Sequence, residues 1–230
     1  MKYTEINIKQ DMPIVADAMR YLQTSIERLK REKYNVVFHK TRGDEAVIYD
    51  TVEPLRENGY DILFRVMAVH ELESKMSALE RSLDQFQNLG FCRWVEQKYH
   101  NTHYAGVVDL SERFEQEQHA DAIEVFIRGK KINEPVLVFA ELLNERLLTN
   151  PYMQDANGAC VIRNFNNDKY SNVRSAINNE RSSAVMEILE GYDKRLNQAR
   201  AIAKATGCER AGEFISECEQ LQANNQKRFE

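Results

Sequence analysis

The sequence predicts an α+β fold with antiparallel strand pairing, followed by a helical C-terminal region. Two stretches, residues 15–49 and 69–108, each combine a helix-like apolar stripe with a β-hairpin pattern. A helix that leads directly into a hairpin can pack on the inner face of that hairpin. The chain also has only 9 Gly and 4 Pro among 230 residues. That scarcity favours long helices over a many-stranded barrel.

The first stretch begins with a helix. Residues 3–8 alternate apolar and polar types and predict a short strand before it. Asp11 stands where a helix N-cap would, and apolar residues then recur at three- and four-residue spacing: Val15, Met19, Leu22, Ile26 and Leu29. Residues 34–39 and 46–49 predict the two strands of the first hairpin, joined by a glycine-containing turn.

The second stretch repeats this order. Residues 60–69 fit either a strand or the first turns of a helix that ends near Leu89. Because they are rich in β-forming types, we expect a strand that runs into the helix. Residues 90–95 and 104–108 predict the second hairpin. The polar and acidic residues 111–120 predict a surface link.

A small α/β layer is expected next. Residues 123–127 alternate as a strand, and Pro135 opens a predicted helix that reaches Leu147. Residues 159–165 predict a last short strand.

Two helices end the predicted fold. Residues 185–203 carry apolar residues at 4-3-4-3-4 spacing, a coiled-coil-like seam that ends before Gly207. A final helix is expected over residues 211–221. The predicted domains are an α+β body (1–110), a small α/β layer packed on it (111–168) and a C-terminal helical assembly region (169–230).

Composition describes an ordinary cytoplasmic protein. The net charge of −5 argues against a surface built throughout to neutralise phosphates. The cysteines at 92, 160, 208 and 218 show no C-x-x-C spacing, so neither a zinc ribbon nor a redox dithiol is indicated, and buried thiols are expected. The longest purely apolar run is residues 136–140, too short for a membrane span.

Enzyme signatures are scarce. The sequence contains no G-x-G-x-x-G, G-x-x-x-x-G-K-[ST], G-x-S-x-G or H-E-x-x-H motif. His100 and His103 form an H-x-x-H pair, but two ligands are too few for a zinc site. We therefore expect no metal and no cofactor, and the sequence leans away from an enzyme.

The predicted function is a non-catalytic interaction protein that assembles, with itself or with another protein, through its C-terminal helices. The surface expected to carry this contact is the seam of residues 185–203, with Val185, Leu189, Tyr192 and Leu196 as its main residues. The alternative for the seam is that it packs against the protein's own α/β body.

Nucleic-acid association is the first alternative function. Arg128, Lys130 and Lys131 form one basic cluster, and residues 28–33 and 40–42 form others. Contact through such separate clusters would be weak and strongly salt-dependent. The helix and aromatic hairpin expected over residues 74–95 also suggest a winged-helix module, although that helix is acidic.

Phosphodiester chemistry is the second alternative. Two H-x-T triplets, His39 with Thr41 and His100 with Thr102, each follow one of the two similar helices. This layout resembles the 2H phosphoesterase superfamily over at most residues 1–110. The resemblance implies that the two histidines act as acid and base on one phosphodiester while the threonines bind its oxygens. Their polar neighbours are typical of solvated turns, so we expect the two triplets not to converge.

Overall fold

The computed structural model describes residues 12–38, 45–92, 94–129, 134–162, 165, 168–183 and 185–228. Helices predominate in this part of the chain, and its paired strands form a three-stranded sheet. The predicted α+β class with a helical C-terminal region is confirmed. The chain divides into two compact units: unit 1 comprises residues 1–40, 72–96 and 186–230, and unit 2 comprises residues 41–71 and 97–185. The predicted division into three domains stays a prediction.

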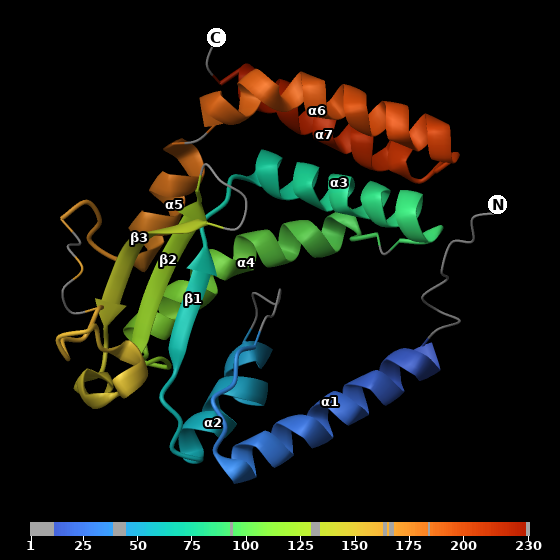
Figure 1. Cartoon of the computed structure of the whole chain (residues 1–230). Helices are drawn as coiled ribbons and strands as arrows, with labels where there is room; N and C mark the ends of the chain where they lie inside the picture. The colour runs from blue at the N-terminus through green and yellow to red at the C-terminus, as the bar shows by residue number, and fades with distance from the viewer. Residues whose placement is uncertain are drawn as a thin grey trace. The chain divides into compact units, whose positions relative to one another are not determined.

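Unit 2 is built on the sheet, whose strand order is β1-β2-β3 (Figure 1). Strand β1 spans Leu63–Met67, β2 spans Ala122–Arg128 and β3 spans Pro135–Leu142. Strand β1 runs parallel to β2, and β2 runs antiparallel to β3. The strands predicted within residues 60–69 and 123–127 are therefore confirmed.

The helix predicted from Pro135 was wrong, because this segment is strand β3. Its Val-Leu-Val-Phe run suits a pleated sheet, and proline is tolerated as the first residue of a strand. Gly129 closes the connection by donating its N–H to the Glu134 carbonyl at 3.1 Å. A Cβ atom at Gly129 would collide with that carbonyl, so the close approach requires glycine.

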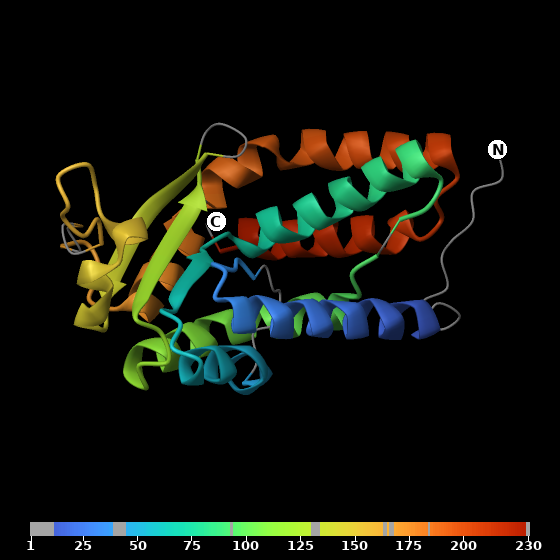
Figure 2. The ribbon, with the colours of Figure 1, turned by 60° about the horizontal axis from the view of Figure 1, so that its bottom comes forward.

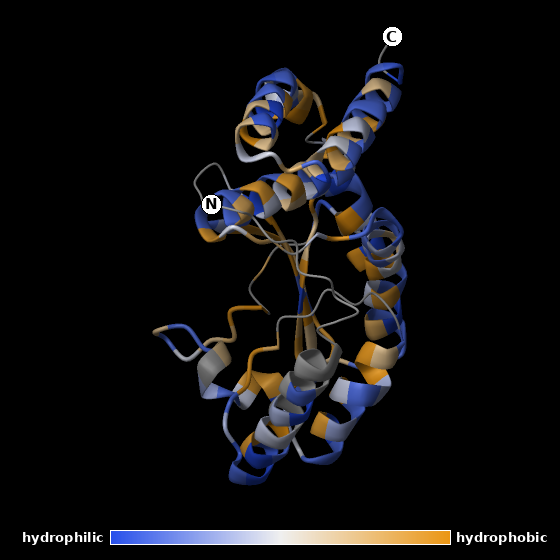
Figure 3. Ribbon diagram, turned by 90° about the vertical axis from the view of Figure 1, so that its right-hand side faces the viewer, coloured by the Kyte–Doolittle hydropathy of each residue, from blue (hydrophilic) through white to orange (hydrophobic). Residues whose placement is uncertain are grey.

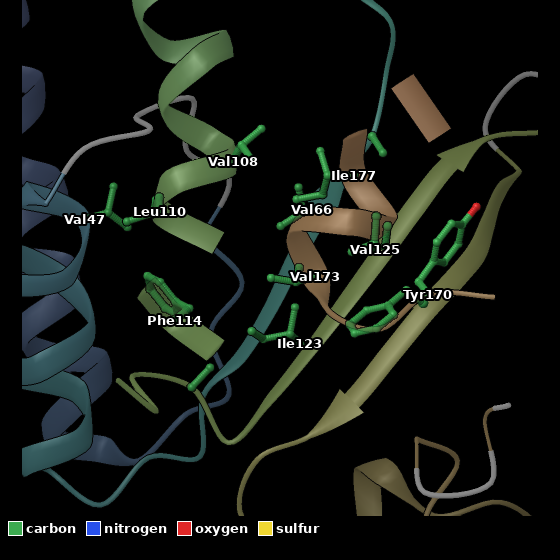
Figure 4. Packing of buried hydrophobic residues seen from close by; sticks show 14 of the residues in the cluster. Val47, Val66, Val108, Leu110, Phe114, Ile123, Val125, Tyr170, Val173 and Ile177 are labelled. Atoms are coloured by element: carbon green, nitrogen blue, oxygen red, sulfur yellow. The ribbon is translucent and has the colours of Figure 1, made fainter. Parts of the chain in front are cut away.

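One face of the sheet is covered by helices α4, Gln97–Gln116, and α5, Val173–Ser183. Figure 4 shows Ile123 and Val125 of β2 directed toward Val173 and Ile177 of α5. The buried cluster on this face also includes Val47, Ile48, Val66, Val108 and Phe114. In Figure 3 the strands carry mostly the hydrophobic colour, and residues 122–125 of the central strand β2 are all buried, as expected for a strand covered on both faces.

Both predicted hairpins were wrong. Residues 46–49 lie in helical structure that leads into the π-helix Ile48–Val52 and α2, Glu53–Glu57; the segment 39–44 lies outside the described residues. Residues 104–108 lie inside α4, which extends through most of the expected link at 111–120. Val108, Ser111 and Phe114 are all buried, and their spacing of three follows a helix rather than a strand.

A smaller cluster lies on the other face of the sheet. Two short 3₁₀ helices, Glu145–Thr149 and Pro151–Met153, follow β3. Leu147 and Met153 pack there with Ala122 and Ala140 of the sheet. A strand was expected over residues 159–165. Among the described residues, this segment pairs only through an isolated bridge between Gln154 and Cys160.

Unit 1 is helical. Its helices are α1, Met12–Glu32, α3, Glu71–Leu89, α6, Val185–Thr206, and α7, Ala211–Gln226. Helices α3, α6 and α7 run alongside one another in Figures 1 and 2. Gly207, with a φ of 69°, separates α6 from α7 as predicted. The expected strand 3–8 and the Asp11 cap lie outside the described residues.

Two further observations concern the whole described chain. All four cysteines are buried thiols, as predicted. No helix in the described ranges is both long enough and apolar enough to cross a membrane.

Candidate functional site

The carboxyl ends of β1 and β2 lie at the same edge of the sheet, because the two strands are parallel. The Ala68 N–H donates to the Phe126 carbonyl at 2.7 Å, which extends the pairing beyond the end of β1. In open α/β sheets, ligands bind outside the carboxyl ends of parallel strands. The residues that follow β1 are therefore candidates for ligand contacts.

Tyr104 of α4 is attached to this edge. Its hydroxyl donates to the Val69 carbonyl, two residues beyond β1, at 3.0 Å. Burial raises the pKa of Tyr104 to about 12, with Arg181 acting in the opposite direction and Glu71 adding to the rise. The phenol is therefore neutral at physiological pH and acts as a hydrogen-bond donor.

Arg181 of α5 lies over the Tyr104 ring. Its guanidinium carbon is 3.9 Å from the ring centroid, and its Nη2 donates to the Tyr104 carbonyl at 3.1 Å. The Nε atom is buried without a hydrogen-bond partner. Burial lowers the pKa of Arg181, although Tyr104 and Glu71 act to raise it. Within the described ranges, no carboxylate forms an ion pair with this guanidinium.

Three more rings lie on the first two turns of α4. The His100 ring stacks on Tyr104 with centroids 5.8 Å apart, and Tyr99 meets His103 edge-on at 3.9 Å. Both contacts join residues four positions apart, which are neighbours on one side of a helix. We call Tyr99, His100, His103, Tyr104 and Arg181 the ring cluster.

The ring cluster can bind an anion and move a proton. The guanidinium supplies charge and directed N–H donors, and the imidazoles are the usual proton-transfer groups near neutral pH. Tyr99 is 46% exposed, so the cluster is reachable from solvent. Among the described residues, no group of three His, Cys, Asp or Glu side chains could hold a metal ion.

Of the two predicted H-x-T triplets, the structure describes only the one that contains His100 and Thr102. His100 and Thr102 lie on a helix instead of at a strand end, and two helical steps separate their side chains by about 200°. They therefore do not face one ligand together. His39 and Thr41 lie outside the described residues, so the expectation that the two triplets do not converge stays a prediction.

The predicted seam is largely buried, and from residue 186 onward it belongs to unit 1. Val185, Tyr192 and Leu196 are buried, and Leu189 is half-buried. The Tyr192 hydroxyl donates to the Leu72 carbonyl of α3 at 3.3 Å. A seam that packs on its own unit offers little apolar area to another protein.

The predicted basic cluster is also only partly described. Arg128 is exposed at the carboxyl end of β2. Lys130 and Lys131 lie outside the described residues, so their joint surface stays a prediction.

Sequence reasoning missed Tyr104 and Arg181. Tyr104 was assigned to a return strand, and Arg181 lay in the C-terminal region 169–230 without an assigned role. A usable signal was the four-residue spacing from Tyr99 to His103 and from His100 to Tyr104, which indicates a helix that gathers its rings on one side.

Comparison with solved structures gives a distant likeness. A chain from the PezAT chromosomal toxin-antitoxin system of the human pathogen Streptococcus pneumoniae is 17% identical, with a TM-score of 0.47. The alignment covers 79% of this chain and 62% of that chain, so this chain spans less than two thirds of the length of that protein. A likeness this weak supports no argument. No curated protein matches the chain.

The family comparison is decisive. The sequence profile of Zeta toxin matches residues 10–134, more than half of the chain. This match contradicts the predicted non-catalytic assembly function and places the chain in a toxin family instead. It keeps the expectation of a protein partner in general form and supports neither the C-terminal helices nor nucleic acid as the contact. The chain belongs to the Zeta toxin family.

Proposed function

We propose that the protein is a toxin that acts enzymatically on an anionic small molecule, with the ring cluster as part of its substrate site. Family membership supports the toxin, and the condition of Arg181 supports the anion. Its guanidinium is half-buried, and its buried Nε has no partner. A desolvated cation with an unsatisfied donor is stabilised by an anion that supplies both a charge and an acceptor.

The geometry of Arg181 favours a phosphate or carboxylate group. A planar guanidinium presents its donors as a fork that matches two oxygens of such a group. Tyr104 holds the fork through its ring and its carbonyl, and its own hydroxyl is committed to Val69. The orientation of Arg181 is thus set before a ligand arrives, which lowers the entropy cost of binding.

His100 and His103 are the candidates for proton transfer. They lie on the same two turns as Tyr104, and each ring packs against a tyrosine. An imidazole close to a bound anion can accept or donate the proton of a reacting hydroxyl. The printed sequence contains no G-x-x-x-x-G-K-[ST] motif, so the proposal assigns anion contacts to side chains and to no glycine-rich loop.

Growth arrest tests the proposal. The full chain is expressed from an inducible promoter in a bacterial host, alongside Arg181→Ala and Arg181→Lys. We expect the wild type to stop growth and Arg181→Ala to reduce killing at least about tenfold, since a lost charge-assisted hydrogen bond is worth about 1.5–3 kcal/mol. Arg181→Lys keeps the charge but loses the fork, so we expect partial toxicity.

Arg200→Ala is the matched control. Arg200 is an exposed arginine of α6 that pairs with Glu219, remote in sequence from the ring cluster. It should remain as toxic as the wild type. Circular dichroism and soluble yield show whether each variant is folded. A folded Arg181→Ala variant that kills as well as the wild type, or a wild type without toxicity, would refute the proposal.

A further inference from the structure

Two carboxyl groups meet on the helix-covered side of the sheet. Glu141 of β3 is paired in register with Ile123 of β2, and its side chain is in hydrogen-bond contact with that of Glu115 on α4. Two carboxyl groups in hydrogen-bond contact cannot both be ionised at low cost, so one proton is shared between them.

Glu115 has a second attachment. Its Oε1 accepts a hydrogen bond at 2.7 Å from the N–H of Val173, the first residue of α5. An N–H at a helix N-terminus favours a negatively charged acceptor. Because Glu115 already accepts this backbone hydrogen bond, the proton that the pair shares is placed on Glu141.

No neighbouring charged side chain in the described part of the chain neutralises the Glu115–Glu141 pair. Arg174, the residue after Val173, is held by Asp109 and Glu112 of α4. From β2, the side chains on this face are Ile123 and Val125, which are apolar. In the ranges that the structure describes, neither Glu115 nor Glu141 pairs with a cation. Burial, followed by the contact with Glu115, raises the pKa of Glu141 to about 7.

We propose that Glu141, Glu115 and the first turn of α5 form a proton-dependent latch. Protonated Glu141 donates to Glu115, and Glu115 holds the N-terminus of α5. Loss of the Glu141 proton places two negative charges in contact, so the attachment of α5 to β3 weakens as pH rises through neutrality. Helix α5 also carries Arg181, but the latch does not depend on the proposed function.

The sign of the pH effect follows from proton binding. The carboxyl of Glu141 has its ordinary pKa of about 4.5 in the unfolded chain and about 7 in the folded protein. Between these values the folded state holds more protons than the unfolded state. Stability contributed by this group is therefore fully present below about pH 4.5 and decreases as pH rises through about 7.

Nuclear magnetic resonance of the full chain tests the latch directly. The carboxyl carbon of Glu141 should titrate near pH 7, and the Val173 amide should shift with the same midpoint. In Glu141→Gln, whose amide can still donate to Glu115, the Val173 amide should no longer titrate there. Glu145→Gln, a change at an exposed glutamate, is the control and should titrate as the wild type does.

The wild-type titration alone decides the outcome if a variant fails to fold. A Glu141 carboxyl that titrates below pH 5 would overturn the latch. So would a Val173 amide whose neutral-pH midpoint persists in folded Glu141→Gln. Both measurements are independent of toxicity, so failure of the latch and failure of the proposed function are separate results.

Discussion

The hydroxyl of Tyr192 on α6 donates a hydrogen bond to the carbonyl of Leu72 on α3. The same hydroxyl is in hydrogen-bond contact with Cys218 of α7, and burial raises the pKa of Tyr192. One phenol therefore joins three helices of unit 1. The apolar seam of α6 is part of the core of this unit.

Replacement of a seam residue should therefore destabilise the protein. Leu196 is 1% exposed. Leu196→Ala removes buried methyl groups and leaves a cavity, so we expect the free energy of unfolding to fall by about 2–4 kcal/mol. Denaturant unfolding followed by circular dichroism measures the change.

Leu89→Ala is the matched control for this prediction, because Leu89 is 60% exposed. Its effect should stay within about 0.5 kcal/mol. Equal stability of the two variants, with a lower molecular mass only for Leu196→Ala, would instead mean that the seam lies between copies of the chain.

Arg195 is predicted to be a second stabilising residue of unit 1. Its Nε and Nη2 each contact Glu80 at 2.7 Å, and Glu73 binds the same guanidinium. These contacts, led by the hydrogen bond to Glu80, raise the pKa of Arg195. Arg195→Met leaves two carboxylates without their cation, and we expect a loss of about 1–2 kcal/mol at pH 7.

The pH dependence of this loss distinguishes charge from packing. A protonated carboxyl group carries no charge to pair with a guanidinium, so the difference between Arg195→Met and the wild type should shrink in acid. Thermal unfolding at pH 7 and at pH 3.5 checks this. A constant difference across pH would assign the role of Arg195 to its methylene groups.

The helices with a regular apolar period could be predicted from the sequence. Helices α6 and α7 and the break at Gly207 were found, because each apolar stripe persists for several turns. Short apolar runs were ambiguous. Val47 and Ile48 suit a strand locally, but they lie in helical structure whose apolar side is buried in the core of unit 2. Tertiary packing determined whether these segments became helix or strand, and no local sequence pattern reports that packing.

The ring cluster depends on the fold rather than on a motif. Tyr104 and Arg181 are 77 residues apart in sequence and meet because α4 and α5 cover the same face of the sheet. Wrong assignment of residues 104–108 to a strand separated Tyr104 from its ring neighbours. The family was not predicted, because the sequence contains no G-x-G-x-x-G, G-x-x-x-x-G-K-[ST], G-x-S-x-G or H-E-x-x-H motif.

A pair of glycine substitutions should change stability in opposite directions. Gly129→Ala forces a Cβ onto the Glu134 carbonyl and should destabilise the β2–β3 connection by more than about 1 kcal/mol. Gly191 lies within α6 with open space around its Cα. Gly191→Ala should stabilise the protein by about 0.5–1 kcal/mol, because alanine is the better helix former. Melting temperatures of the two variants, compared with the wild type, should move apart; a shared direction would contradict the hairpin geometry.

Tyr104 should make stability depend on alkaline pH. Its pKa is about 12 in the folded protein and about 10 when unfolded, so the folded state holds the phenolic proton more tightly. Stability from this group is therefore present below pH 10 and is lost as pH rises toward 12. Tyr104→Phe removes the titration and also the hydrogen bond to Val69, and loss of that bond should cost about 0.5–1.5 kcal/mol at pH 7.

Between pH 9 and pH 11.5 the stability of the wild type should fall more steeply than that of Tyr104→Phe. Tyr99→Phe, at a partly exposed ring on the same helix, should follow the wild type. Parallel pH profiles for the wild type and Tyr104→Phe would mean that the Tyr104 hydroxyl is hydrated and that its contact with the edge of the sheet does not hold α4 in place.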